Sequence, residues 1–149
     1  MCGRYTLIEP NLETLLASDQ EIIDDRASIS IWKPRYNIAP FQSLPVFALK
    51  GDHKVHLTFQ HWDLIPSYTP SNTKDLKQKY KMINLKVENV TDSKKPYWNR
   101  LLKTQRCLVP VSGFYEWQIQ PGKQPKKPYY IYLKEQKPFT LAGLWDSHF

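Results

Sequence analysis

The last third of the chain alternates short apolar segments with short turns, and this pattern constrains the fold more than any other feature. Strand-forming Val, Ile, Tyr, Phe and Leu are concentrated in residues 106–111, 113–118, 128–134 and 139–145. A loop that contains Pro121-Gly122-Lys123 separates the middle pair. We therefore predict an α+β fold built on a curved, largely antiparallel β-sheet that is barrel-like, with a few short helices.

The earlier residues predict two helices and a hairpin. Pro10 and Asn11 favour the start of a short helix over residues 11–17, and Pro96 favours another over 95–102. Residues 44–50 and 54–60 resemble two strands joined by a turn at Lys50-Gly51-Asp52-His53. We expect the acidic residues 19–25 to form a loop or a helix end, and the Lys-rich stretch up to Lys81 to form a loop or an exposed helix.

The final strand-like segment, Phe139 to Trp145, is followed only by Asp146-Ser147-His148-Phe149. A sheet that ended there would have an unpaired apolar edge strand, which native proteins usually avoid or cover. We expect residues 1–149 to form one domain that is shortened at its C-terminus. A homodimer formed through the exposed sheet edge is one way to cover it.

Composition favours a polyanionic partner. Lys+Arg 21 against Asp+Glu 14 gives a net charge of +7, and the 5 Trp and 9 Tyr offer rings on which bases can stack. The sequence contains neither an apolar stretch approaching the roughly 20 residues that span a membrane nor the pattern of a signal peptide, so we expect a cytoplasmic protein. Cys2 and Cys107 are too few for a disulfide framework, and Cys107 lies in an apolar run that predicts a buried, inert thiol.

Cys2 follows the initiator methionine directly. If Met1 is removed, the chain begins with a cysteine that carries a free α-amine and a thiol, whose reference pKa values are roughly 7.7–8.0 and roughly 8.5. Such a 1,2-aminothiol condenses with an aldehyde to an imine, and the thiol then closes a five-membered thiazolidine ring. The alternative is that Cys2 stands at a frayed terminus by chance and has no catalytic role.

Five sequence blocks, in order, resemble the SRAP family (SOS response-associated peptidase). Together with Met1-Cys2-Gly3-Arg4-Tyr5 they extend along essentially the whole chain: Arg35-Tyr36-Asn37-Ile38-Ala39-Pro40, Trp62-Asp63-Leu64-Ile65-Pro66, Ile83-Asn84-Leu85-Lys86-Val87-Glu88, residues 106–117 and Ala142-Gly143-Leu144-Trp145-Asp146. The resemblance implies a mixed fold around a curved sheet, a positively charged groove that binds single-stranded DNA, and a covalent crosslink from the mature cysteine to the aldehyde of an abasic site. The family name reflects a proposed autoproteolytic removal of the initiator methionine.

By this resemblance Cys2, Asn84 and Glu116 match catalytic positions, and Pro40, Trp62 and Trp117 match positions near the groove. Imine formation needs loss of water, so a carboxyl group that shuttles protons suits the reaction, and an amide such as Asn84 orients groups without adding charge. An abasic site has no base to read, so phosphates and flanking bases must be recognised. We expect Arg4 and Lys86 to bind phosphates. Strand alternation alone would also allow Glu116 on a solvent-facing side, and Trp62 and Trp145 in the core.

The chain departs from the family at three points. Lys86 replaces an arginine, which keeps the charge but loses the bidentate fork, and Asp63 replaces a glycine. In the family a histidine lies across the site from the glutamate. His148 does not stand in the sequence motif of that histidine, so we do not assign it this role and we expect slower crosslinking. The histidines at 53, 56 and 61 have no accompanying carboxylate or thiol, and we predict no metal and no cofactor.

Two other functions remain open at the level of the sequence. One is a non-catalytic domain that binds single-stranded DNA through the same basic groove. The other is an N-terminal-nucleophile glutamine amidotransferase, because those enzymes also begin Met-Cys-Gly and use the α-amine as the base. The chain lacks the later arginine–glycine–aspartate-type segments that hold glutamine in such enzymes.

Overall fold

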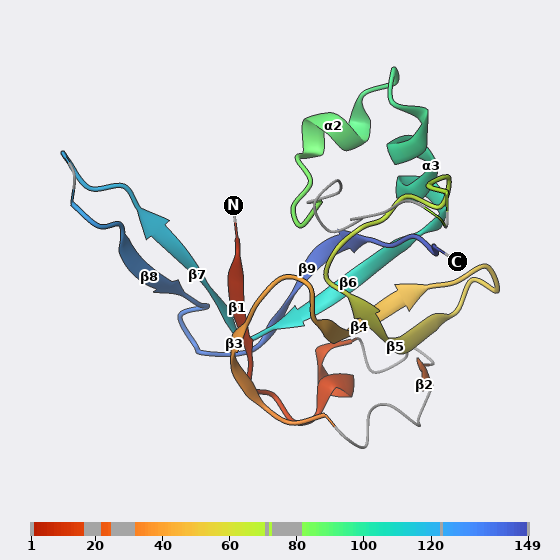
Figure 1. Cartoon of the computed structure of the whole chain (residues 1–149). Helices are drawn as coiled ribbons and strands as arrows, with labels where there is room; N and C mark the ends of the chain where they lie inside the picture. Colours follow the sequence, from red (N-terminus) through yellow and green to blue (C-terminus); the bar gives the residue numbers. More distant parts are fainter. Residues whose placement is uncertain are drawn as a thin grey trace.

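Short strands make up most of the regular structure of the chain (Figure 1). The computed structural model describes residues 2–16, 22–24, 32–70, 72, 82–122 and 124–148. In these residues the elements are β1 (Arg4–Leu7), the 3-10 helix η1 (Leu12–Leu15), β2 (Ile22–Asp24), β3 (Arg35–Ile38), β4 (Ser43–Leu49), β5 (Val55–His61), α2 (Val87–Thr91), α3 (Pro96–Thr104), β6 (Arg106–Val111), β7 (Gly113–Gln118), β8 (Lys127–Ile131) and β9 (Phe139–Leu144).

The described strands form two open sheets. One has the order β3-β1-β7-β8 and the other the order β2-β5-β4-β6-β9. Every pairing is antiparallel except that of β2 with β5. The predicted α+β class and the largely antiparallel architecture are confirmed, but two open sheets stand where a single barrel-like sheet was expected.

The chain passes from one sheet to the other at Ser112 and Gly113, between β6 and β7. The Ser112 N–H donates to the Thr6 carbonyl at 2.7 Å, and the Ser112 hydroxyl accepts from the Ile8 N–H at 2.9 Å. Gly113 is required by close packing, because a Cβ there would lie 2.4 Å from the Tyr130 hydroxyl. This corner ties β1 to the junction of the two sheets.

The core lies between the inner faces of the two sheets. Tyr5 and Leu7 from β1, Ile38 from β3 and Phe47 and Val111 from the second sheet belong to one buried cluster. Burying each of the larger apolar side chains contributes roughly 1.5–3 kcal/mol. A second cluster contains Val46, Ala48 and Cys107, against which Trp145 packs. These contacts hold β1, and hence the N-terminal end of the chain, in the middle of its sheet.

The segments with clear periodicity were predicted well. The β4–β5 hairpin pairs Leu49 with Val55, and its turn places His53 at φ 61°. Helix α3 begins at Pro96 as expected and buries Leu101. Strands β6 to β9 match the four predicted strands closely, although β8 ends at Ile131. Among the described strands, β9 ends the order of its sheet, which is the edge position expected for the last segment.

Other segments were predicted wrongly or not at all. Residues 22–24 form β2, a strand parallel to β5, where a loop or helix end was expected. The described part of the first predicted helix is only the short 3-10 helix η1. Strands β1 and β3 and helix α2 were not predicted. Most of the Lys-rich stretch before residue 82 lies outside the described residues.

Helices α2 and α3 form a lobe that is fastened to the end of β9 by Asp146. The Asp146 carboxylate accepts hydrogen bonds from the Tyr97 hydroxyl at 2.7 Å, the Ser67 N–H at 2.9 Å and the Gln105 amide at 3.0 Å. Arg100 lies 3.4 Å from the same carboxylate. Within the described residues, no helix is both long enough and apolar enough to cross a membrane.

Candidate active site

Cys2 lies two residues before β1, the strand between β3 and β7 in its sheet. Its side chain is half-buried and packs against the main core cluster. The Sγ atom donates to the Arg4 carbonyl at 3.3 Å. Because β1 is hydrogen-bonded to a strand on each side, Cys2 is held close to a fixed strand. The structure therefore presents Cys2 at the edge of the core and does not seal it inside.

Asn84 reaches Cys2 from a distant part of the sequence. Its side-chain Nδ2 donates to the backbone carbonyl oxygen of Cys2 at 2.7 Å. Asn84 is exposed and lies three residues before α2 begins, in a segment without helix or strand. The preceding carbonyl, that of Ile83, accepts a hydrogen bond from the Trp62 indole N–H at 2.9 Å. The amide of Asn84 is thus brought to the carbonyl of the candidate nucleophile.

Glu116 approaches the same residue from β7. The pairing of Arg4 with Tyr115 places Glu116 level with the start of β1. Burial raises the pKa of the Cys2 thiol, hydrogen bonding with the backbone of Arg4 lowers it, and the negative charge of Glu116 raises it again, with a net rise. The thiol is therefore more fully protonated at neutral pH than a free cysteine. A neutral thiol beside a carboxylate suits a reaction in which protons are exchanged between them.

The structure thus brings together the three residues that the sequence nominated as catalytic. It also shows contacts that the sequence did not suggest. Tyr5, only 3 % exposed, packs its ring 5.3 Å from that of Trp62. Burial raises the pKa of Tyr5, and its hydroxyl has no hydrogen-bond partner among the described residues. Nothing in the apolar pattern around Tyr5 distinguishes it from an ordinary core residue.

The five residues nominated for DNA binding lie around this centre in different settings. Arg4 donates from Nη1 to the Asn37 side chain at 2.8 Å. Pro40 lies in a turn, and the next residue, Phe41, donates its N–H to the Trp62 carbonyl. Trp117 is 41 % exposed on β7, and Lys86 is exposed at the N-cap of α2. Trp62 itself is half-buried, with its ring against Tyr5.

Three expectations about other residues can be compared with the structure. Cys107 is buried, as predicted, and burial raises the pKa of its thiol to about 12. Trp145 packs against the second core cluster and donates its indole N–H to the Leu49 carbonyl at 3.3 Å, which matches its interpretation as a core residue. The expectation that no carboxylate accompanies the hairpin histidines is wrong for His56, because its Nε2 lies 2.9 Å from the Asp52 carboxylate, four residues earlier in the chain.

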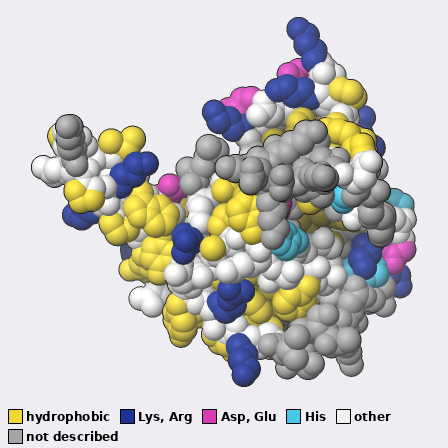
Figure 2. All heavy atoms as spheres, viewed as in Figure 1, with side chains coloured by type: hydrophobic (Ala, Val, Ile, Leu, Met, Phe, Trp, Pro, Cys, Tyr) yellow, Lys and Arg dark blue, Asp and Glu magenta, His cyan; other side chains and the backbone are white. Residues whose placement is uncertain are grey.

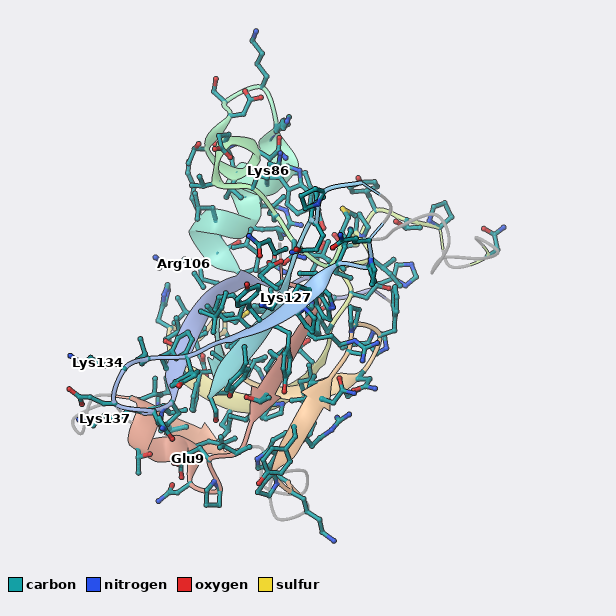
Figure 3. All side chains as sticks on the ribbon, turned by 90° about the vertical axis from the view of Figure 1, so that its left-hand side faces the viewer. Glu9, Lys86, Arg106, Lys127, Lys134 and Lys137 are labelled. Atoms are coloured by element: carbon teal, nitrogen blue, oxygen red, sulfur yellow. The ribbon has the colours of Figure 1, made fainter. Side chains whose placement is uncertain are left out.

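The candidate site lies between two projections of the molecule. In Figure 1 the β7–β8 hairpin extends to one side of β1, and α2 and α3 rise on the other. Figure 2 shows a hollow between these projections, with Lys and Arg side chains on both. Figure 3 shows Lys86 on the helical lobe and Lys127 on the hairpin. Exposed lysines on the two projections include Lys86, Lys94, Lys126 and Lys127.

The sequence and the fold both resemble those of known proteins. The family described as SOS response associated peptidase (SRAP) matches residues 1–149. The chain belongs to the SRAP family. Its sequence is 36% identical over 151 residues to the "abasic site processing protein YoaM" of Bacillus subtilis, and 35% identical over 147 residues to YoqW of the same species, whose name has the same form. Both alignments include 99% of this chain.

A phage-related protein from Bordetella bronchiseptica has a similar structure, with a TM-score of 0.69 and 28% identity over 96% of this chain. The SRAP chain described here spans only part of these proteins. It covers 62% of YoaM, 61% of YoqW and 60% of the Bordetella structure.

Proposed function

We propose that this protein captures abasic sites in single-stranded DNA through a covalent bond to Cys2, working in the cytoplasm at the nucleoid. The convergence of Asn84 and Glu116 on Cys2 is the observation that carries this proposal. The hydrogen bond from Asn84 to the Cys2 carbonyl supports it, as does the effect of Glu116 on the thiol. The printed names of YoaM and YoqW refer to abasic site processing, which supports the choice of substrate.

The reaction uses the aldehyde of the ring-opened deoxyribose. Once Met1 has been removed, the Cys2 amine adds to the aldehyde carbon to give a carbinolamine, which loses one water and becomes an imine. The thiol sulfur then adds to the imine carbon, and the thiol proton passes to nitrogen as the five-membered ring closes. Glu116 accepts and returns the protons that these steps exchange. Asn84 donates a hydrogen bond to the Cys2 carbonyl and so restrains the orientation of the amine and the thiol of the same residue.

The strand would lie in the hollow between the two projections. Arg4 and Lys86 bind phosphates on either side of the lesion, and Pro40, Trp62 and Trp117 contact the unstacked nucleotides. Each base stacked on an aromatic ring contributes roughly 1–3 kcal/mol. Because much of the affinity comes from phosphate contacts, binding should weaken steeply as the salt concentration rises.

The decisive test compares single-stranded oligonucleotides with and without one abasic site. The protein should form a band that survives denaturation only with the abasic strand, and its mass should equal protein without Met1 plus oligonucleotide minus one water. Cys2→Ala should abolish this adduct, whereas Cys107→Ala, at a buried thiol, should retain it. The absence of any adduct from a protein with a confirmed Cys2 amine would contradict the proposal.

Removal of Met1 is proposed to be autoproteolytic, by addition of water across the Met1–Cys2 peptide bond at the same site. Glu116→Gln should then keep Met1, and wild type should lack it, as measured by intact mass. Complete removal of Met1 in Glu116→Gln would assign the cleavage to another enzyme.

A non-catalytic domain that binds single strands is the second candidate, favoured by the exposed lysines on both projections. Equal affinity for intact and abasic strands, unchanged by Cys2→Ala, would support this candidate instead. The amidotransferase alternative gains nothing from the relatives, whose printed names refer to abasic sites.

A homodimer through a sheet edge is also proposed. Among the described strands, β9, which contains the last strand-like segment, ends its sheet, so two copies could pair there edge to edge. Sedimentation equilibrium should give twice the monomer mass for wild type and the monomer mass for a variant with a charge on this strand at an exposed position, Ala142→Lys. A monomeric wild type would contradict this assembly.

A further inference from the structure

Trp62 is anchored in the protein through both its ring and its main chain. Its ring centroid lies 5.3 Å from that of Tyr5, with an interplanar angle of 58°. Its backbone N–H donates to the Gln42 carbonyl and its carbonyl accepts from the Phe41 N–H, both at 2.9 Å. Phe41 itself has a φ of 67°, a left-handed conformation that costs a bulky residue energy and marks a tightly determined turn.

From this anchored position the indole of Trp62 reaches the segment that carries Asn84. Nε1 donates to the Ile83 carbonyl oxygen at 2.9 Å. That oxygen and the backbone nitrogen of Asn84 belong to one planar peptide unit. A hydrogen bond to the Ile83 carbonyl therefore restrains the point from which the Asn84 side chain extends.

Asn84 needs such a restraint. Its hydrogen bond to the Cys2 carbonyl is exposed, so water competes for both partners and the net stabilisation is small. Residues 82–85 lie outside the described helices and strands, so no strand ladder or helix holds them in place. The Trp62 indole supplies a half-buried hydrogen bond at the residue next to Asn84.

We infer, building on the proposed function, that Trp62 is a positioning residue, which keeps the Asn84 amide on the Cys2 carbonyl through its hydrogen bond to Ile83. The carbonyl, amine and thiol of Cys2 are all borne by one residue, so a misplaced carbonyl turns the reacting groups away from the aldehyde. By this positioning Trp62 raises the rate of the chemical step, an effect distinct from any contribution of its ring to DNA binding.

The test replaces Trp62 with Phe, which keeps an aromatic ring against Tyr5 but removes the indole N–H. Trp145→Phe is the matched control, because Trp145 is also half-buried and donates its indole N–H to a backbone carbonyl, that of Leu49. Trp62→Phe should lower the maximal rate of adduct formation roughly two- to tenfold, the worth of one hydrogen bond. The DNA concentration that gives half this rate should change less than the maximal rate, because Phe keeps an aromatic face for the nucleotide, and Trp145→Phe should match wild type in both values.

Two results would overturn the inference. One is an equal fall in rate in both tryptophan variants, which would indicate a general loss of structure. The other is a rise in the half-saturating DNA concentration of Trp62→Phe with no change in maximal rate, which would make Trp62 a DNA contact alone.

A double-mutant cycle tests whether Trp62 acts through Asn84. In a chain that already carries Asn84→Ala, Trp62→Phe should cause no further loss of rate, since the group it positions is absent. If the two losses multiply fully, Trp62 acts by another route.

A measurement without DNA separates this inference from the proposed function. The Asn84 side-chain amide pair can be assigned in a ¹⁵N NMR spectrum by its disappearance in Asn84→Ala. These resonances should shift in Trp62→Phe and stay in place in Trp145→Phe. If wild type forms no adduct, the proposed function fails, but the spectrum still tests whether Trp62 positions Asn84. Asn84 resonances that do not move in Trp62→Phe would overturn the positioning role.

Discussion

The side-chain amide of Asn84 lies 2.7 Å from the backbone carbonyl oxygen of Cys2, although the two residues are 82 positions apart in the chain. This contact joins the segment before α2 to the segment before β1. It is made to the main chain of Cys2, so in the proposed reaction it orients the amine and the thiol and leaves both able to react.

Loss of this contact should slow the reaction and leave the fold intact. Asn84→Ala, and Asn84→Asp, which cannot donate a hydrogen bond, should each lower the maximal rate of adduct formation about tenfold, because about 1.4 kcal/mol of orientation is lost. The residue is exposed, so the free energy of unfolding should change by less than about 0.5 kcal/mol. Stopped reactions run on denaturing gels measure the rate, with Asn89→Ala as the control. Wild-type rates in both Asn84 variants would contradict the assigned role.

The reactivity of Cys2 should depend on the charge of Glu116. A negative charge near a thiol disfavours the thiolate, so Glu116→Gln should lower the pKa of Cys2. Iodoacetamide labelling followed by mass spectrometry should then reach half its maximal rate at a lower pH than in wild type. Cys107, whose pKa is about 12, contributes little to labelling below pH 10. Glu135→Gln, at an exposed carboxylate, should leave the profile unchanged, and an unchanged profile in Glu116→Gln would contradict the expected charge effect.

Asp146 should stabilise the folded chain at neutral pH and lose this effect in acid. Burial alone would raise its pKa, but hydrogen bonds from Ser67, Tyr97 and Gln105 outweigh burial and lower the pKa to about 2. The unfolded value is about 3.9, so the folded state gains about 2 kcal/mol above pH 4, and this gain disappears as the pH falls toward 2.

Urea unfolding of Asp146→Asn should therefore show a loss of about 2 kcal/mol at pH 7 and little loss at pH 2.5. The control is Glu135→Gln, whose exposed ion pair with Lys137 contributes little. A loss of the same size at both pH values would indicate a steric effect of the substitution, not a charge effect.

Gly143 should resist substitution because of the thiol opposite it in β6. A Cβ at position 143 would lie 2.9 Å from the Cys107 Sγ and 3.3 Å from a Val109 methyl group. Gly143→Ala should therefore destabilise the protein by about 1–3 kcal/mol. Cys107→Ala removes the clashing sulfur, so the double variant should lose less than the sum of the two single variants.

Thermal and urea unfolding measure these differences. Gly51→Ala is the matched control, because a Cβ there meets nothing within 4 Å. Additive losses would show that β9 shifts to accept the methyl group without touching Cys107.

Elements with strong local signals were predictable from the sequence. Pro96 at the start of α3, and the apolar runs of β4, β5, β6 and β7, placed these elements to within one or two residues. The same approach failed for β1, β3 and α2. These elements are four or five residues long, too short to show a period, and their partners in space fix their conformation.

The candidate site divides in the same way. The order of the family blocks nominated Cys2, Asn84 and Glu116, because the spacing of such blocks is a property of the sequence. Strand alternation allowed Glu116 to face solvent, and only the pairing of β1 with β7 brings it near the thiol.

The sequence by itself therefore determined the residue types, the terminal position of the candidate nucleophile and the period-two pattern of the longer strands, since these depend only on neighbours along the chain. The tertiary structure decided that the strands form two open sheets and that Trp62, half-buried against Tyr5, fastens the backbone beside Asn84. A hydrogen bond between residues 21 or 82 positions apart leaves no periodic trace in a sequence. Only the packing of the folded chain creates it.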